Sequence, residues 1–364
     1  MIPFLARWTH FMETNPLYFA LGRPFSPLYG LAMHLRERLY KKGILRSHRL
    51  GIPVVSIGNL TLGGTGKTPM VQYLARLLQE HGFRPAVVSR GYGGTANGKV
   101  NLVSDGVSLL LDAHAAGDEP RLLAETLPGV PVLTGIVRRL PARHAQEMGA
   151  DVLLLDDGFQ HLQIIRDVNL VLFNADRLAG NSRVFPGGDL REPVAALRRA
   201  THFIMTGVHE ANRERGERFA DLLRSKFPGI PIAFAGLRME CLVTIAPSGM
   251  IVPAQAEPLC QQHPCFGFCG IAHPDLFRQT LVEQGFALAG FFPLDDHQRY
   301  HEALLNRLLA EARKSGAQWL LTTEKDLVKL AGLAAHLPIP LYGLRMRVTT
   351  DAQFFRAIIE PLWP

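Results

Sequence analysis

Short runs of Val, Ile, Leu and Phe recur through the first two thirds of the chain, with few polar residues among them. Uninterrupted apolar runs of this length are typical of strands that are buried on both faces, as in a parallel sheet covered by helices. On this pattern we predict strands at residues 53–57, 86–89, 130–133, 152–155, 170–173 and 202–205.

Helical periodicity separates several of these runs. Residues 67–81 carry apolar side chains at a spacing of three to four, and Gly82 suits the end of that helix. After short, proline-containing runs at 231–255, the alternation of strand and helix resumes. There we predict a strand, two helices and a strand at 265–270, 274–284, 301–315 and 319–322. The pattern predicts an α/β fold with a mostly parallel sheet flanked by helices, and a smaller second α/β unit.

The first 50 residues contain an amphipathic segment. Apolar side chains on one helical face are Leu28, Leu31, Ala32, Leu35 and Leu39. Arg38 and Lys42 flank this face, as in helices that lie in a membrane interface with basic side chains reaching lipid phosphates. The same periodicity fits a helix packed on the protein's own core. We expect neither a membrane span nor a signal peptide.

Composition and charge narrow the class of protein. With 364 residues, 47% hydrophobic and 20% charged, the chain is globular and long enough for about two or three domains. Residues 1–50 carry eight basic and two acidic residues, a net charge of +6, against +1 for the remaining 314 residues. This distribution argues against a nucleic-acid surface across the protein and favours contact between the N-terminal segment and an anionic membrane.

Four cysteines are too few for a disulfide scaffold, and we expect a reducing, cytosolic setting. Cys260, Cys265 and Cys269 lie near His263 and His273 in the sequence, but their spacing is unlike that of a zinc site. Because Cys265 and Cys269 fall in an apolar strand pattern, we expect them in the core.

A glycine-rich loop between the first strand and the first helix carries the strongest chemical signal. Its sequence is Gly63-Gly64-Thr65-Gly66-Lys67-Thr68, which in this position is typical of a phosphate-binding loop (P-loop). Glycines let backbone N–H groups turn toward phosphate oxygens, Lys67 reaches the β- and γ-phosphates, and the Thr68 hydroxyl binds Mg²⁺. Thr61 stands where such loops usually begin with glycine, so we expect the backbone to enter the loop at a different angle.

The strand at 152–155 is followed by Asp156 and Asp157. In nucleotide-binding sheets an aspartate at a strand end holds Mg²⁺ directly or through water. Neighbouring residues of an extended chain point to opposite sides, so one carboxylate is enough for the metal, and the sequence leaves open which. The polar cluster Gly158-Phe159-Gln160-His161 follows, at the sheet edge where open α/β sheets bind ligands.

Further motifs accompany the P-loop. They are Gly58-Asn59-Leu60-Thr61 before it and Pro69 after it, Ser89-Arg90-Gly91-Tyr92, Gly117-Asp118-Glu119-Pro120, Asp156-Asp157-Gly158-Phe159-Gln160-His161 and Gly188-Asp189-Leu190-Arg191-Glu192. In this combination the chain resembles the tetraacyldisaccharide 4′-kinase family of lipid A biosynthesis over essentially its whole length. Thr61 ceases to be unusual, because members of that family carry Ser or Thr there. The family is similar in fold to P-loop NTPases and uses MgATP to phosphorylate the 4′-hydroxyl of an acylated glucosamine disaccharide.

The resemblance implies roles for individual residues. Asp118 would accept the proton of the acceptor hydroxyl, paired with His297 from the second domain; each partner of such a pair stabilises the other's charge. Without the family, Asp118 fits a turn residue and His297 a surface histidine. Arg191 and Glu192 would lie near the nucleotide or metal, although they also fit an exposed ion pair at a helix start. The remaining implied pocket residues are Tyr92, Arg138, Gln160 and His161.

We therefore predict three regions: a basic membrane-associating segment at 1–50, a P-loop kinase core at 51–235, and a smaller C-terminal α/β domain at 236–364 that closes over the cleft. Residues 322–326, Thr-Thr-Glu-Lys-Asp, follow a predicted strand. They either line the cleft between domains or, as we favour, begin a helix with Thr as its cap and acidic residues in the first turn.

Two other functions fit parts of the sequence: a membrane-associated NTPase switch that acts on a protein partner, and a lipid-binding scaffold. A GTP switch usually carries Asn-Lys-x-Asp, which this sequence lacks, and a dimeric switch ATPase carries Lys where Leu62 stands. Lys67, Thr68 and Asp156 argue against a scaffold. We predict a kinase that uses ATP and Mg²⁺, acts on a lipid disaccharide, binds no nucleic acid, and lies peripherally on the cytoplasmic face of the inner membrane.

Overall fold

The sheet of the N-terminal half is built from the apolar runs of the sequence. The computed structural model, which describes residues 16–254, 263–296, 298–334 and 337–362, confirms all six strands predicted there. They are β1 (Val54–Asn59), β2 (Pro85–Ser89), β4 (Val132–Thr134), β5 (Val152–Asp156), β6 (Val168–Asn174) and β7 (His202–Thr206). They pair in parallel in the order β7-β6-β1-β5-β2-β4. At the edge, β3 (Asn101–Ser104), which the pattern did not predict, pairs antiparallel with β4.

Helices pack on both faces of this sheet, which explains why its strands lack polar alternation. Leu170 and Leu172 of β6 pack in one core cluster with α4 (Lys67–Glu80), whereas Val171 and Phe173 pack in another with α8 (Arg213–Lys226). The helix predicted at 67–81 is α4 and is confirmed. The other helices of this unit are α5 (Ala113–Ala116), α6 (Asp118–Thr126) and α7 (Arg139–Glu147).

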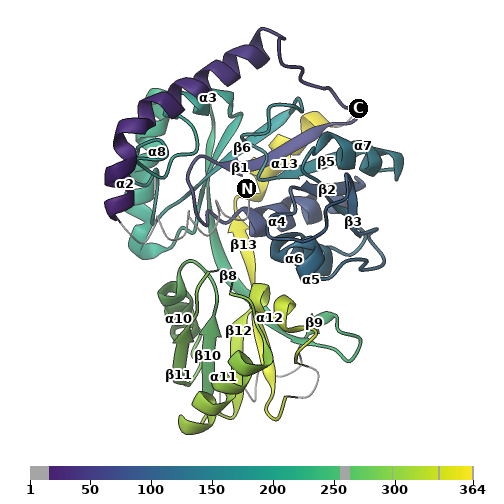
Figure 1. Cartoon of the computed structure of the whole chain (residues 1–364), viewed down its shortest axis with the longest axis vertical. Helices are drawn as coiled ribbons and strands as arrows, with labels where there is room; N and C mark the ends of the chain where they lie inside the picture. Colours follow the sequence, from purple (N-terminus) through teal and green to yellow (C-terminus); the bar gives the residue numbers. More distant parts are fainter. Residues whose placement is uncertain (1–15, 255–262, 297, 335–336, 363–364) are drawn as a thin grey trace.

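Two long strands join this unit to a second one (Figure 1). β8 (Ile232–Ile245) begins parallel to β7 and then lies antiparallel to β13 (Leu341–Thr350). Beyond them the sheet continues in the order β13-β12-β10-β11, all parallel. The elements here are β9 (Ile251–Pro253), β10 (Cys265–Cys269), α10 (Pro274–Glu283), β11 (Leu288–Pro293), α11 (Glu302–Lys314), β12 (Trp319–Thr323) and α12 (Glu324–Leu330). The two strands and two helices predicted between 265 and 322 are confirmed as β10, α10, α11 and β12.

The two units share chain segments. The expected boundary between residues 235 and 236 lies inside β8, whose middle is partly exposed between the units. This change of burial along one strand broke the apolar pattern at 231–255. At the C-terminus, α13 (Ala352–Ile359) returns to the first unit, where Phe355 and Ile358 pack in the same cluster as Met70 and Leu74 of α4.

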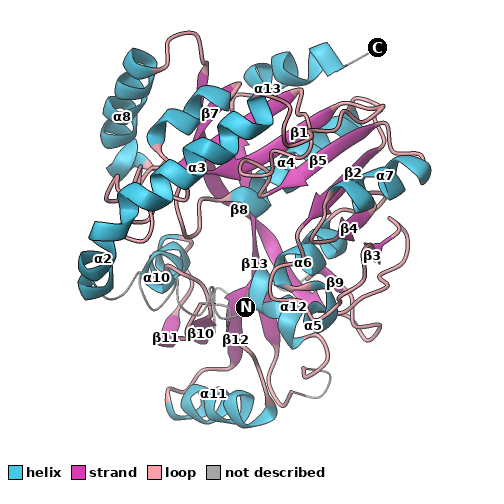
Figure 2. Ribbon diagram, turned by 45° about the horizontal axis from the view of Figure 1, so that its top comes forward, coloured by secondary structure: helices cyan, strands magenta, loops and turns pink. Residues whose placement is uncertain are grey.

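The N-terminal helices α2 (Pro16–Gly22) and α3 (Ser26–Lys41) form an arm along the outside of the first unit (Figures 1 and 2). None of the 16 residues of α3 is buried, and Leu28, Leu31 and Leu35 are 68%, 65% and 55% exposed. The interpretation of this segment as a helix that packs these leucines on its own core is therefore wrong. Among the described residues, no helix combines the length and apolar character that a membrane crossing needs.

Cys265 and Cys269 are free and buried in β10, as predicted. Cys260 lies outside the described residues.

Candidate phosphoryl-transfer site

The glycine-rich loop runs from β1 to the start of α4. Gly63 and Gly66 have φ of 89° and 75°, a region that other residues rarely adopt, so the loop requires glycine at both positions. The Thr65 carbonyl accepts a hydrogen bond from the Thr206 hydroxyl at 2.8 Å, which ties the loop to the end of β7. Lys67 is the first residue of α4, so the positive end of the helix faces the loop.

A second segment holds the entrance of this loop. Thr61 forms an antiparallel bridge with Leu190, and the Arg191 N–H donates to the Leu60 carbonyl at 2.8 Å. An extended, paired conformation suits a β-branched residue, which explains threonine at the position where P-loops usually carry glycine. The same pairing places Arg191 beside the loop.

Asp156 ends β5, the strand next to β1, where it lies opposite Ile57. It is buried and accepts a hydrogen bond from the Ser89 hydroxyl at 3.1 Å. Its other oxygen, Oδ1, has no hydrogen-bond partner among the described residues. Burial, with the negative charges of Glu119 and Asp157 nearby, raises the pKa of Asp156 to about 7. A buried carboxylate oxygen without a partner is the kind of ligand that Mg²⁺ takes.

Asp157 has different surroundings. Its φ of 51° is left-handed, so the expectation of an extended chain through both aspartates is wrong here. Arg191 Nη1 lies 2.9 and 2.8 Å from the two carboxylate oxygens, and Lys67 Nζ lies 3.4 Å from Oδ1. Arg138 donates to the Asp157 carbonyl at 2.7 Å. Burial alone would raise the pKa of Asp157, but Arg191, Lys67 and Arg138 hold it well below its usual range.

The donor set fits a magnesium-bound nucleotide. Gly64 of the loop is exposed, and Thr68 is half-buried in the first turn of α4. In the part of the chain that the structure describes, no three His, Cys, Asp or Glu side chains form a cluster that could hold a metal ion. Magnesium at nucleotide sites needs only one or two protein side chains, because phosphates and water complete its coordination. Thr68 with Asp156 meets that requirement.

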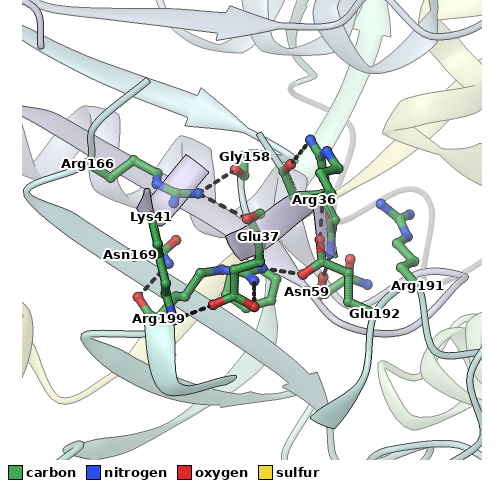
Figure 3. A network of polar contacts seen from close by, with 12 residues as sticks. Arg36, Glu37, Lys41, Asn59, Gly158, Arg166, Asn169, Arg191, Glu192 and Arg199 are labelled. Atoms are coloured by element: carbon green, nitrogen blue, oxygen red, sulfur yellow. Dashed lines mark hydrogen bonds and ion pairs between the residues drawn. The ribbon is translucent and has the colours of Figure 1, made fainter. Parts of the chain in front are cut away.

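Glu192 belongs to a network that attaches α3 to the first unit (Figure 3). Its side chain is buried, pairs with Arg199 and lies 3.6 Å from Arg36 of α3. Arg191, in contrast, pairs with Asp157. The alternative of an exposed Arg191–Glu192 ion pair is therefore wrong.

Arg36 also connects α3 with the loop after β5. It donates to the Gln160 carbonyl at 2.9 Å, and the Gln160 side chain donates to the Asn59 carbonyl at 2.8 Å. His161 is next in this loop. Burial and the neighbouring arginines lower the pKa of His161 to about 3, so its ring is neutral. Sequence reasoning missed this role of Arg36, because nothing in its local pattern distinguishes it from the other basic residues of α3.

Asp118 is the first residue of α6, and Gly117 holds that helix start in place. Gly117 has φ of 93°, and a Cβ there would lie 2.4 Å from the Tyr92 carbonyl. The Tyr92 side chain is 44% exposed. Asp118 Oδ2 lies 3.5 Å from Lys329 Nζ of α12. His297 lies outside the described residues, so its pairing with Asp118 stays a prediction.

Residues 322–326 combine both of their expected roles. Thr323 caps α12, because its hydroxyl accepts a hydrogen bond from the Asp326 N–H at 3.1 Å, as we favoured. The same helix also faces the first unit, with Lys325 Nζ 3.9 Å from Glu119 of α6. The motif is thus both a helix start and part of the surface between the units.

Comparison with known proteins decides the family. A model of the Tetraacyldisaccharide-1-P 4′-kinase family matches residues 18–362. The chain belongs to this family.

Curated tetraacyldisaccharide 4′-kinases are similar along nearly their whole length. The relative from Desulfotalea psychrophila is 46% identical over 354 residues, 96% of this chain and 98% of the relative. The relative from Syntrophus aciditrophicus is 43% identical over 351 residues, 92% and 91% of the two chains. A crystal structure of LpxK from Aquifex aeolicus in complex with ATP is 30% identical, has a TM-score of 0.74, and covers 93% of this chain and 98% of that one. The P-loop NTPase-like fold predicted from the sequence is confirmed.

Proposed function

We infer that the protein is a tetraacyldisaccharide 4′-kinase that transfers the γ-phosphoryl group of ATP to the 4′-hydroxyl of a tetraacyldisaccharide 1-phosphate. The observation that carries this inference is the convergence of Lys67, Arg191 and Arg138 on Asp157 beside a P-loop, in a chain of that family. Phosphoryl transfer needs this concentration of positive charge, because the transferring group carries negative charge on three oxygens. A nucleotide switch is not favoured, because the family relation spans residues 18–362.

The cations would act on the phosphates. Backbone N–H groups of the loop and the Lys67 ammonium bind the β- and γ-phosphates, and Arg191 neutralises charge on the transferring group. Asp157 holds both side chains beside the loop through its two carboxylate oxygens. Arg138 fixes the backbone of Asp157.

Mg²⁺ would be held by Thr68 and Asp156, with Asp157 as the second candidate. Asp156 is favoured for the direct contact because its Oδ1 is buried without a partner, whereas the charge of Asp157 is neutralised by two cations. The ion supplies neutralisation of charge on the β- and γ-phosphates.

Asp118 would accept the proton of the 4′-hydroxyl, paired with His297. As the hydroxyl oxygen bonds to phosphorus, the bond to the ADP oxygen breaks and the proton passes to the carboxylate. The position of Asp118 in the first turn of α6 supports this role, since a helix N-terminus favours the ionised form. Tyr92, Gln160 and His161 would line the pocket. Glu192 would contribute through the contact between α3 and the site.

Helix α3 would carry the protein to an anionic membrane. Three leucines of α3 are more than half exposed, and Arg38, Lys41 and Lys42 lie at its end. An exposed apolar face with basic flanks is the signature of a helix that lies in a membrane interface. The acylated substrate is itself a lipid, and we place the protein peripherally on the cytoplasmic face of the inner membrane.

A cavity of 630 Å³ between α3 and residues 183–193 would take part of an acyl chain. Leu31, Val184 and Pro193 contribute to its lining, and Leu31 belongs to the exposed face of α3. The cavity therefore continues the surface that we expect to contact lipid.

A transfer assay with γ-labelled ATP and the acylated disaccharide tests the proposed function. A kinase places label in the lipid, a switch releases it only as free phosphate, and a scaffold leaves it in ATP. Lys67→Ala should abolish the labelled lipid, whereas Lys226→Ala, at an exposed position in the last turn of α8, should not. Label that appears only as free phosphate in the wild type would overturn the proposal.

A further inference from the structure

Helix α12 of the second unit presents two lysines to the first turn of α6. Lys325 and Lys329 are four residues apart and share one helical face. Lys325 Nζ lies 3.9 Å from Glu119 Oε1, and Lys329 Nζ lies 3.5 Å from Asp118 Oδ2. Figures 1 and 2 both place α12 beside α5 and α6.

Lys329 is held by its own unit. Its side chain is 6% exposed, and its ammonium contacts Asp326 Oδ1 at 3.0 Å and the Gln298 carbonyl at 3.4 Å. With Asp118, these contacts give three oxygen partners for the three N–H donors of an ammonium. Lys329 is therefore directed at Asp118 by fixed neighbours, unlike a mobile surface lysine.

Asp326 is in turn anchored from two sides. It is fully buried, and its Oδ2 accepts hydrogen bonds from the Gly270 N–H at 2.9 Å and the Thr323 hydroxyl at 2.7 Å. These bonds leave Oδ1 for Lys329. A continuous chain of contacts thus runs from Gly270, at the end of β10, through Asp326 and Lys329 to Asp118 in the other unit.

We propose that Lys329 is a positioning residue for phosphoryl transfer, whose buried ammonium, oriented by Asp326, keeps the Asp118 carboxylate ionised and in one orientation across the two units. The proposal rests on the proposed role of Asp118 as the proton acceptor. A protonated Asp118 cannot take the hydroxyl proton, so the fraction in the ionised form limits the rate at acidic pH.

The charges that face Asp118 favour this effect. Lys325 and Lys329 approach from α12, together with Asp326. Glu119 is next on α6, and Asp296 lies 3.9 Å from Lys325; these carboxylates oppose ionisation of Asp118. Tyr300 lies near Lys329, with its ring centroid 5.7 Å from the ammonium. A cation at this distance from a carboxylate lowers its pKa by about 1 to 3 units, and Lys329 is the one in ion-pair distance.

The test is the pH dependence of kcat/KM for phosphorylation of the lipid, measured between pH 5 and 9. In Lys329→Met the acidic limb should move to higher pH by about one unit or more, with about tenfold lower kcat/KM below the limb for each unit. At high pH the variant should approach the wild type. Lys329→Arg, which keeps the charge, should restore the position of the limb.

Two further variants make the outcome specific. Lys314→Met removes an exposed lysine of α11 that pairs with Glu311 and should leave the profile unchanged. Lys329→Met leaves Asp326 buried without its cation. For that reason Lys329→Met/Asp326→Asn is measured as well, since the amide oxygen of Asn can still accept from Gly270 and Thr323. It should show the same shift, with folding checked by thermal unfolding.

Asp118→Asn separates failure of this inference from failure of the proposed function. If Asp118→Asn is inactive and both Lys329→Met variants keep the wild-type limb, the role of Lys329 is overturned and the base assignment stands. If Asp118→Asn turns over normally, the base assignment fails and the inference fails with it. A uniform loss of kcat/KM at every pH in folded Lys329→Met would show a structural role only.

Discussion

Helices α3 and α4 have similar lengths and similar amphipathic patterns, yet they relate to the protein in opposite ways. Seven of the 14 residues of α4 are buried, including Met70 and Leu74, whereas none of the 16 residues of α3 is buried. The contacts that hold α3 are polar: Tyr29 donates to the Arg191 carbonyl at 3.0 Å, and Glu37 lies 3.2 Å from Arg199.

The comparison shows what a hydrophobic pattern determines and what it leaves open. Periodicity identifies a helix and its apolar face, but not whether that face meets the protein or another medium. In α4 the face is covered by the sheet. In α3 the polar face is covered and the leucines are outside, so their partner must come from beyond the described chain. The concentration of basic charge at 1–50 was the sequence signal that distinguished the two cases.

The largest effect is expected at the start of α4. Lys67→Ala should lower kcat by about 10²–10³-fold, because the transferring group loses a fixed positive charge. The fold should remain intact, since Asp157 keeps Arg191 as its partner. Steady-state kinetics with thermal unfolding as a check measures both, and Lys226→Ala is the control. Near-normal turnover of Lys67→Ala would remove the P-loop from the mechanism.

Matched leucine truncations test burial directly. Leu74→Ala, in α4, should lower the free energy of unfolding by about 2–5 kcal/mol, because it leaves a cavity in the core. Leu31→Ala, in α3, should change it by less than about 0.5 kcal/mol, since the side chain is 65% exposed. Denaturant unfolding of both variants measures the difference. A comparable loss in Leu31→Ala would mean that α3 packs through its leucines after all.

Charge reversal tests the outer surface of α3. Replacing Arg38, Lys41 and Lys42 with Glu should weaken binding to anionic vesicles, at about 1 kcal/mol for each residue. The matched control makes the same change at Arg213, Arg215 and Arg218, exposed residues of α8. Sedimentation with vesicles at moderate salt measures the binding. Equal losses in both triple variants would indicate a general charge effect without a role for α3.

The smallest effect concerns His161, which follows the loop residue that Arg36 of α3 contacts. Its pKa of about 3 in the folded protein lies below the model value of 6.5, so between these values only the unfolded chain binds the proton. Stability should therefore fall as the pH drops below 6.5, by up to about 1.4 kcal/mol per pH unit. His161→Gln should remove this part of the slope. Urea unfolding between pH 5 and 7.5 checks it, and an unchanged slope in the variant would contradict the burial of this ring.

Much of the fold was predictable because its central strands are buried on both faces. Strands β1, β5 and β6 each appear as uninterrupted apolar runs, and α4 has a clear period. β3 is an edge strand of four residues, and β8 changes from buried to exposed and back between the units. Neither leaves a continuous pattern, because burial along them is set by tertiary neighbours that the sequence does not display.

The site was predictable where chemistry and backbone geometry require particular residues. Gly63, Gly66 and Gly117 need positive φ, and Lys67 must begin a helix. Arg36 and Lys329 could not be found in this way. Each acts through a contact more than 100 residues away along the chain, and a lone basic residue in a helix carries no local sign of its partner.

The account as a whole claims that α4 serves the chemistry and α3 serves the surface on which the lipid is presented. Transfer of labelled phosphate to the acylated disaccharide, measured once on anionic vesicles and once in dispersed detergent, tests this division directly. Lys67→Ala should lose transfer in both media, whereas the Arg38, Lys41 and Lys42 reversal should lose it on vesicles and keep it in detergent. Equal activity of the reversal variant in both media, or equal loss in both, would contradict the account.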